Sequence, residues 1–215
     1  MTDGLLYVLT DPGRVPTAEF HRWYDTDHAP RRLAVPGIRS GARYRAVDGA
    51  SPQWMACYDV DLAALDSPAY LRLRSRSGYE QELVDRFEVL DRRVYELLEE
   101  HGGPPRPPGP AMLVSVALSS SDEDALQRWY TEEHIPLLHA VPGWRRSRRY
   151  RLRSGAGPHL LTLHDIDGPD VFDSPGYLRA TTTARGARVR ADVTARERRV
   201  YTLHNTVNAP GAAIS

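Results

Sequence analysis

Two short apolar runs, at residues 5–9 and 112–118, open two stretches of chain that share one order of hydrophobic and polar positions. A short apolar run bounded by polar or turn residues favours a buried strand. After each run, apolar side chains recur at spacings of three and four, and this period predicts a helix, over 17–33 in the first stretch. We expect Thr17 to cap the first helix, and a cap with acidic residues at 121–124 to begin the second.

Proline and glycine mark where these helices bend and end. Pro30 and Pro136 lie within or just past the helices and are expected to kink them. The pairs Pro36-Gly37 and Pro142-Gly143 then predict a turn.

A hairpin and a second helix complete the pattern. In the first stretch, strands are predicted over 38–47 and 53–61, a second helix from Ser67-Pro68, and a closing strand at 93–98. The order strand–helix–strand–strand–helix–strand is that of a ferredoxin-like α+β unit.

The two stretches are copies of one sequence. Residues 20–61 align with residues 126–167 at a constant offset of 106, and 18 of the 42 aligned positions are identical. The match resumes in DSPAYLR against DSPGYLR and in RRVYEL against RRVYTL. We therefore predict a first α+β repeat over 1–99, a Pro/Gly-rich linker over 100–110, a second repeat over 111–208 and a flexible tail over 209–215.

Composition narrows the class of protein. The formal net charge is zero, which disfavours a nucleic-acid partner. We find no signal peptide and no apolar run of membrane-spanning length, and we therefore expect a cytoplasmic protein without a membrane partner. All 28 Lys+Arg residues are arginine, so Schiff-base chemistry on a lysine and the Walker P-loop are excluded.

The motif around the first helix resembles a known family. Trp23, Tyr24, Asp27, His28 and Pro30, followed by the A-V-P-G turn, have matching residues at Trp129, Tyr130, Glu133, His134 and Pro136. This pattern is similar to the EthD-like branch of the dimeric α+β barrel superfamily. The resemblance implies that both halves of the barrel lie in one chain, an intramolecular dimeric α+β barrel of tandem ferredoxin-like βαββαβ repeats. The superfamily includes polyketide cyclases, anthrone-type monooxygenases, isomerases and haem-using enzymes, so the fold leaves the reaction open.

His28 and His134 are the leading catalytic candidates. Each follows a tyrosine by four residues, so Tyr24 and Tyr130 share a helix face with them. Imidazole suits proton transfer near neutral pH, and a phenol beside it can orient a substrate oxygen. The alternative role for both histidines is to brace the junction between helix and strand.

Further aromatic and polar residues are candidates for substrate binding. Trp23 and Trp129 lie on the same helices, where the core is their alternative position. Trp54 and Tyr58 share one face of the third strand, and His164 is the counterpart of Tyr58 in the second copy. Tyr70 and Tyr177, in the second helices, offer further hydroxyl groups.

The arginines of the second strand do not favour an anion-binding site, and the spacing of the histidines does not favour a metal site. Arg43, Arg45, Arg149 and Arg151 recur at period two, which favours a solvated or interface face over a cradle for an anion. No metal-ligand spacing is present, and we expect neither a metal nor an organic cofactor.

These observations predict a cofactor-independent acid–base enzyme, of cyclase or dehydratase type, acting on a hydrophobic, aromatic polyketide-like molecule. The alternatives are a cofactorless anthrone-type monooxygenase, a haem-binding protein with an axial histidine, and a non-catalytic binder of a hydrophobic metabolite. The chain is expected to be a monomeric pseudo-dimer or a homodimer.

Overall fold

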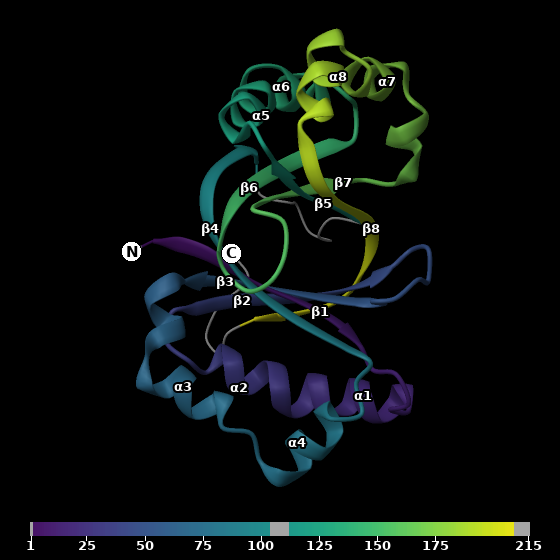
Figure 1. Ribbon diagram of the computed structural model, residues 1–215. Helices are drawn as coiled ribbons and strands as arrows, with labels where there is room; N and C mark the ends of the chain where they lie inside the picture. The colour runs from purple at the N-terminus through teal and green to yellow at the C-terminus, as the bar shows by residue number, and fades with distance from the viewer. Residues whose placement is uncertain (1, 104–111, 209–215) are drawn as a thin grey trace. The chain divides into compact units, whose positions relative to one another are not determined.

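The computed structural model describes residues 2–103 and 112–208, and the predicted tail lies outside them. Each repeat contains the predicted elements in the predicted order (Figure 1). The first comprises β1 (Asp3–Asp11), α1 (Thr17–Trp23), η1 (Tyr24–His28), α2 (Ala29–Leu33), β2 (Ile38–Ala46), β3 (Trp54–Asp61), η2 (Leu62–Asp66), α3 (Pro68–Arg74), α4 (Gly78–Val84) and β4 (Val89–Gly102). The second comprises β5 (Met112–Ser120), α5 (Glu123–Trp129), η3 (Tyr130–His134), α6 (Ile135–His139), β6 (Trp144–Ser154), β7 (Leu160–Ile166), η4 (Pro169–Asp173), α7 (Pro175–Thr181), α8 (Ala184–Ala191) and β8 (Val193–Asn208).

All strand pairs with a defined register are antiparallel. In the first repeat β1 pairs with β3 and β4, and β2 pairs with β3. In the second, β5 pairs with β7 and β8, and β6 pairs with β7. The hydrogen-bonded order β1-β3-β2-β8-β5-β7-β6-β4 closes into a barrel. This mixed α+β architecture confirms the predicted fold class, a dimeric α+β barrel built within one chain.

The chain divides into two compact units that do not coincide with the two repeats. Unit 1 takes in β8 from Leu203 onward, and unit 2 takes in β4 from Leu98 onward. The last residues of each closing strand therefore lie in the unit formed mainly by the other repeat. The strand β4 also runs to Gly102, so the first residues of the predicted linker are strand, and residues 104–110 of that linker lie outside the described residues.

In each unit the helices cover one face of the strands, as Figure 1 shows for α1 to α4 over β1, β2 and β3. Phe20 is fully buried in unit 1, with its ring centroid 5.8 Å from Tyr24 and 5.9 Å from Trp54. In unit 2 the equivalent Leu126 is also fully buried. The core thus lies between helices and sheet, as the apolar periods predict.

The helix starts and the proline positions differ in detail from the prediction. Thr17 is the first residue of α1, and Pro16, in the capping position, makes no side-chain cap bond. Asp122, in contrast, accepts a hydrogen bond from the Ala125 N–H and caps α5 as predicted. Instead of a simple kink at Pro30 and Pro136, each helix contains a π turn just before its proline.

Candidate active sites in the two cavities

The π turns place the tyrosine and histidine of each motif beside one another. The Ala29 N–H bonds to the Tyr24 carbonyl, five residues back, and the Ile135 N–H bonds likewise to Tyr130. Pro30 and Pro136 lack an N–H, so an ordinary α-helical bond is missing at this point in both helices. The ring centroids lie 4.7 Å apart for Tyr24 and His28, and 5.1 Å apart for Tyr130 and His134.

A cavity of about 590 Å³ opens beneath the π turn of the second repeat. Its apolar lining comes mostly from alternate residues of β5 (Val114, Val116, Leu118), and the aromatic ring of Trp144 also lines it. Five predicted site residues line it: Trp129, Tyr130, His134, His164 and Tyr177.

His134 has a defined tautomer. Its Nδ1 lies 3.0 Å from the Ala180 carbonyl oxygen, which can only accept a hydrogen bond. The neutral ring therefore carries its proton on Nδ1 and has an unshared pair on Nε2. Burial lowers the pKa of His134 to about 4, against a smaller opposing effect of the Ala180 bond, so the ring is neutral at physiological pH. Its ring stacks on Trp129 at a centroid distance of 4.3 Å.

His164 is held in the opposite tautomer. The Trp144 indole N–H, which can only donate, points at Nδ1 of His164 across 3.3 Å, and the Ser147 hydroxyl lies 2.8 Å from the same nitrogen. The neutral ring therefore carries its proton on Nε2. Burial, followed by the charge of a protonated His134, keeps the pKa of His164 well below its ordinary value. One cavity wall thus contains one imidazole that can accept a proton and one that can donate a hydrogen bond.

The first repeat has a smaller cavity, of about 410 Å³, in the corresponding place. Trp23, Tyr24, His28 and Tyr70 line it, together with Leu6, Val8 and Thr10 of β1. Four arginines also line it: Arg32, Arg74, Arg76 and Arg92.

His28 has a partner that His134 lacks. Its Nδ1 lies 3.3 Å from the Glu80 carboxylate, and the Glu80 side chain is only 3% exposed. Burial is the main cause that keeps the pKa of His28 well below its ordinary value. Ser77 caps α4 through the Glu80 N–H, and Thr183 caps α8 in the same way through the Gly186 N–H, so Gly186 occupies the position of Glu80. The acid is therefore specific to the first repeat.

Sequence reasoning missed Glu80. The only signal it carries is the Ser77-x-x-Glu80 spacing, which is typical of a helix cap. Its proximity to His28, 52 residues away, depends on the tertiary fold.

Trp54 and Tyr58, for which a substrate-binding role is predicted, are not among the residues that line the first cavity. The Trp54 ring packs instead against His21 and His204, with centroid distances of 4.7 and 5.0 Å. Tyr58 is buried behind the cavity wall and donates a hydrogen bond to the Tyr24 hydroxyl, across 3.0 Å. Burial raises the pKa of both tyrosines, so both hydroxyls stay protonated.

Of the four arginines on the predicted solvated or interface face, Arg43 and Arg149 are buried, each only 2% exposed, so the solvated alternative does not hold for these two. Arg43 donates to Asp25 Oδ1 across 2.7 Å and to His21 Nδ1 across 3.1 Å. The Asn205 amide donates to the same Asp25 oxygen across 2.9 Å. A buried guanidinium needs such a counter-charge, which a strand period cannot reveal.

Arg149 has a corresponding but differently charged set of partners. It donates to Glu99, Gln127 and Thr131, and the Thr131 hydroxyl donates to Glu99 across 2.8 Å. By the repeat offset, Thr131 occupies the position of Asp25, and Glu99 occupies the position of Asn205. The acid that neutralises the buried arginine therefore lies on the helix in unit 1 and on the strand end in unit 2.

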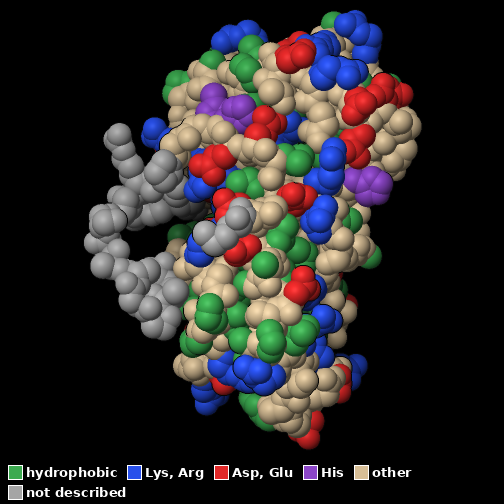
Figure 2. Space-filling model, turned by 90° about the vertical axis from the view of Figure 1, so that its left-hand side faces the viewer, with side chains coloured by type: hydrophobic (Ala, Val, Ile, Leu, Met, Phe, Trp, Pro, Cys, Tyr) green, Lys and Arg blue, Asp and Glu red, His purple; other side chains and the backbone are tan. Residues whose placement is uncertain are grey.

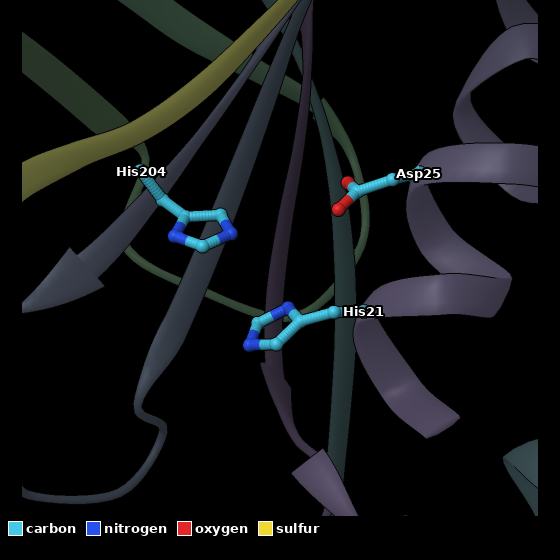
Figure 3. A group of neighbouring side chains, drawn as sticks. All are labelled: His21, Asp25 and His204. Atoms are coloured by element: carbon cyan, nitrogen blue, oxygen red, sulfur yellow. The ribbon is translucent and has the colours of Figure 1, made fainter. Parts of the chain in front are cut away.

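Among the described residues, His21, Asp25 and His204 form a group with metal-like spacing, their ligand atoms lying within 4.8 Å of one another (Figure 3). Figure 3 shows these side chains converging from α1, η1 and the end of β8. Arg43 already donates to two of the three, and after burial it is the next cause that lowers the pKa of His21 and of His204. A divalent cation would be repelled by this guanidinium, so we assign the group to the packing of Arg43.

On the face in Figure 2, arginine and acidic side chains are interspersed. Within 2–103 and 112–208 no helix combines the length and hydropathy needed to cross a membrane.

Comparison with solved structures places the fold in a known class. An anthrone oxidase-like protein superimposes with a TM-score of 0.69 at 14% identity, over 99% of this chain and 97% of that protein. A proposed monooxygenase from Lactobacillus acidophilus NCFM superimposes with a TM-score of 0.59 at 9% identity, over 97% of both chains. A proposed chlorite dismutase gives 0.58 at 16% identity, over 96% of this chain and 95% of the other. The similarity covers both repeats and defines a ferredoxin-like, dimeric α+β barrel fold.

No protein-family model and no curated protein sequence matches the chain. The assignment to the EthD-like branch therefore stays a prediction from the motif.

Proposed function

We propose that the cavity of the second repeat is the active site of a cofactor-independent enzyme that enolises an aromatic ketone and so promotes its cyclisation or dehydration. The observation that carries the proposal is the opposite tautomers of His134 and His164 in one cavity wall. Enolisation needs a base for the carbon acid and a hydrogen-bond donor for the developing oxyanion. The two histidines supply one of each.

In this mechanism, Nε2 of His134 removes a proton from the carbon next to the ketone. The ketone oxygen accepts a hydrogen bond from Nε2–H of His164, which stabilises the enolate. In a dehydration, the enolate then expels a hydroxyl group from the neighbouring carbon. The proton on His134 passes to this hydroxyl, water leaves, and His134 returns to its neutral form.

The rest of the cavity suits an aromatic substrate. The Trp144 and Tyr177 rings stack at a centroid distance of 5.9 Å and an angle of 23°, which gives the wall an extended aromatic surface. Burial raises the pKa of Tyr130, so its hydroxyl remains a donor for a second substrate oxygen. A volume of about 590 Å³ lies within the usual range for small-molecule sites.

The test is solvent exchange of the α-protons of 2-tetralone in D₂O, followed by NMR. This assay isolates the deprotonation step and does not depend on the natural substrate. His134→Gln removes the base and should slow exchange by about 10²–10⁴-fold. His159→Gln is the matched control, because the His159 side chain is 65% exposed. If His134→Gln exchanged protons at the wild-type rate, the proposal would be wrong; tight binding of the ketone without exchange would favour the non-catalytic binder.

A second candidate is cofactorless oxygenation of an anthrone-like substrate, which the names of the structural neighbours favour. The same deprotonation gives a carbanion, which with O₂ and a proton forms a hydroperoxide on the former CH₂ carbon. Loss of water from this hydroperoxide leaves C=O, so one oxygen atom of O₂ enters the product and the other leaves as water. An oxygen electrode separates the two reactions: stoichiometric O₂ uptake with an anthrone identifies the oxygenase, and turnover in anaerobic buffer identifies the cyclase or dehydratase.

A further inference from the structure

The two cavities carry their arginines at different positions. Arg32 and Arg74 line the first cavity, and the aligned residues of the second are Leu138 and Thr181. In the other direction, Arg190 and Arg196 line the second cavity, and the aligned residues of the first are Val84 and Leu90. Arg92 and its counterpart Arg198 line one cavity each. The three arginines of the second cavity are exposed, whereas Arg32 and Arg92 of the first are half-buried.

These arginines are not neutralised by acids. Among the residues that the structure describes, no carboxylate forms an ion pair with Arg32, Arg74, Arg76 or Arg92, and no acidic residue lines the cavity. Three of them form hydrogen bonds with neutral partners. Arg32 donates to the His28 carbonyl across 3.1 Å, Arg92 to the Tyr70 hydroxyl across 3.1 Å, and Arg76 to Gln81 across 3.1 Å.

The half-buried pair Arg32 and Arg92 matters most. A guanidinium that is partly withdrawn from water and lacks a carboxylate partner is a strong site for an anion. Each has bonded only part of its five N–H groups to the neutral partners above. The planar fork of arginine matches a carboxylate in particular.

His28 and Glu80 add a hydrogen-bond acceptor to the lining of the same cavity. The Glu80 carboxylate accepts a hydrogen bond from Nδ1–H of His28, which leaves the unshared pair on Nε2. The imidazole then accepts a hydrogen bond from a hydroxyl of a ligand whose carboxylate is held by the arginines. The apolar residues Leu6, Val8 and Phe87 of the cavity wall suit an aromatic or aliphatic body.

We propose that the cavity of the first repeat is a separate binding site for a small organic carboxylate, held by Arg32 and Arg92. This site is distinct from the proposed active site, and its ligand is smaller. The contrast between about 410 and about 590 Å³ agrees with that difference in size.

The experiment is isothermal titration of the full chain with benzoate, salicylate, benzamide and inorganic phosphate. Benzoate and salicylate should bind, and benzamide, which has the same ring without the charge, should not. Arg32→Leu gives the first cavity the residue of the second, and should weaken benzoate binding by about ten- to a hundredfold, as expected for losing a charge-assisted contact. Arg92→Gln should do the same and serves as a second variant should Arg32→Leu not fold.

Arg22→Leu is the charge-matched control, because Arg22, in α1, is exposed and does not line the cavity. Equal loss of affinity with Arg22→Leu would mean non-specific attraction and overturn the proposal. Loss with Arg198→Gln but not with Arg32→Leu would place the anion in the second cavity and overturn it as well. Phosphate binding that equals benzoate binding would replace the organic carboxylate by a general anion site. These titrations measure binding alone, so their outcome is independent of the tetralone exchange that tests the proposed active site.

Discussion

The buried arginines Arg43 and Arg149 allow a stringent test of whether the neutralising acid can lie on the helix or on the strand end. Glu99→Gln keeps the shape of the side chain but removes the carboxylate that neutralises Arg149. The buried guanidinium then keeps only neutral partners, Gln127 and Thr131. We expect this variant to lower the free energy of unfolding.

The magnitude follows from the burial of the pair. The Arg149 side chain is 3% exposed and that of Glu99 is 26% exposed. Breaking a fully buried pair costs about 3–5 kcal/mol, and an exposed pair is worth about 0–1 kcal/mol. With one partner buried and the other partly solvated, we expect a loss of about 2–3 kcal/mol, which lowers Tm by about 4–12 °C in a chain of this size.

The matched rescue is Thr131→Asp. Glu99→Gln/Thr131→Asp places the acid on the helix and the amide on the strand, which is the arrangement that Asp25 and Asn205 form around Arg43. Urea denaturation of the wild type, the two single variants and the double variant gives the coupling energy. The double variant should regain more than half of the lost stability. If it were no more stable than Glu99→Gln alone, our reasoning about the exchanged charge would be refuted.

Two further predictions concern stability. Burial lowers the pKa of His134 from 6.5 to about 4, so between these pH values the unfolded chain takes up a proton that the folded chain does not. This group should therefore lower the free energy of unfolding by about 3 kcal/mol as pH decreases from about 6.5 to about 4. In urea denaturation of His134→Gln across this range, the free energy of unfolding should lack this dependence on pH. A Cβ added at Gly186 would lie 2.8 Å from the Trp129 ring, whereas one added at Gly78 would meet nothing within 4 Å. Gly186→Ala should accordingly cost about 1–3 kcal/mol, and Gly78→Ala, also near the start of its helix, should stabilise slightly; equal melting temperatures for the two would contradict this packing.

Much of the fold was accessible from the sequence because the repeat tests each local pattern twice. The strands, the hairpins and the caps at Ser67 and Asp122 depend on neighbouring residues, and periodicity and turn chemistry report on these. The π turns were not predicted, since the sequence signals a proline after the helix but not how the preceding turn adapts.

The candidate sites were predicted in part, for the same reason. The Tyr–His spacing on one helix is local, so Tyr24 and His28 were expected together, and both line the cavity. Glu80 and Ala180 contact the histidines through tertiary packing, so no local sequence pattern indicates these two contacts. For Trp54, alternation along a strand gives the face on which the residue lies but not whether a cavity or His204 covers that face. The catalytic roles, the cytoplasmic location and the oligomeric state stay predictions.

The division of β8 between the units has a consequence for how the protein is made. In the sheet β8 is the neighbour of β2, and the part of β8 from Leu203 onward belongs to unit 1. On the ribosome this segment is the last described part of the chain to emerge, so the first repeat is synthesised long before the strand that covers its open edge. An uncovered strand edge is prone to pair with other chains. Nascent chains truncated before Leu203 should therefore depend on chaperones, and the N-terminal half should reach its native state only once β8 has emerged.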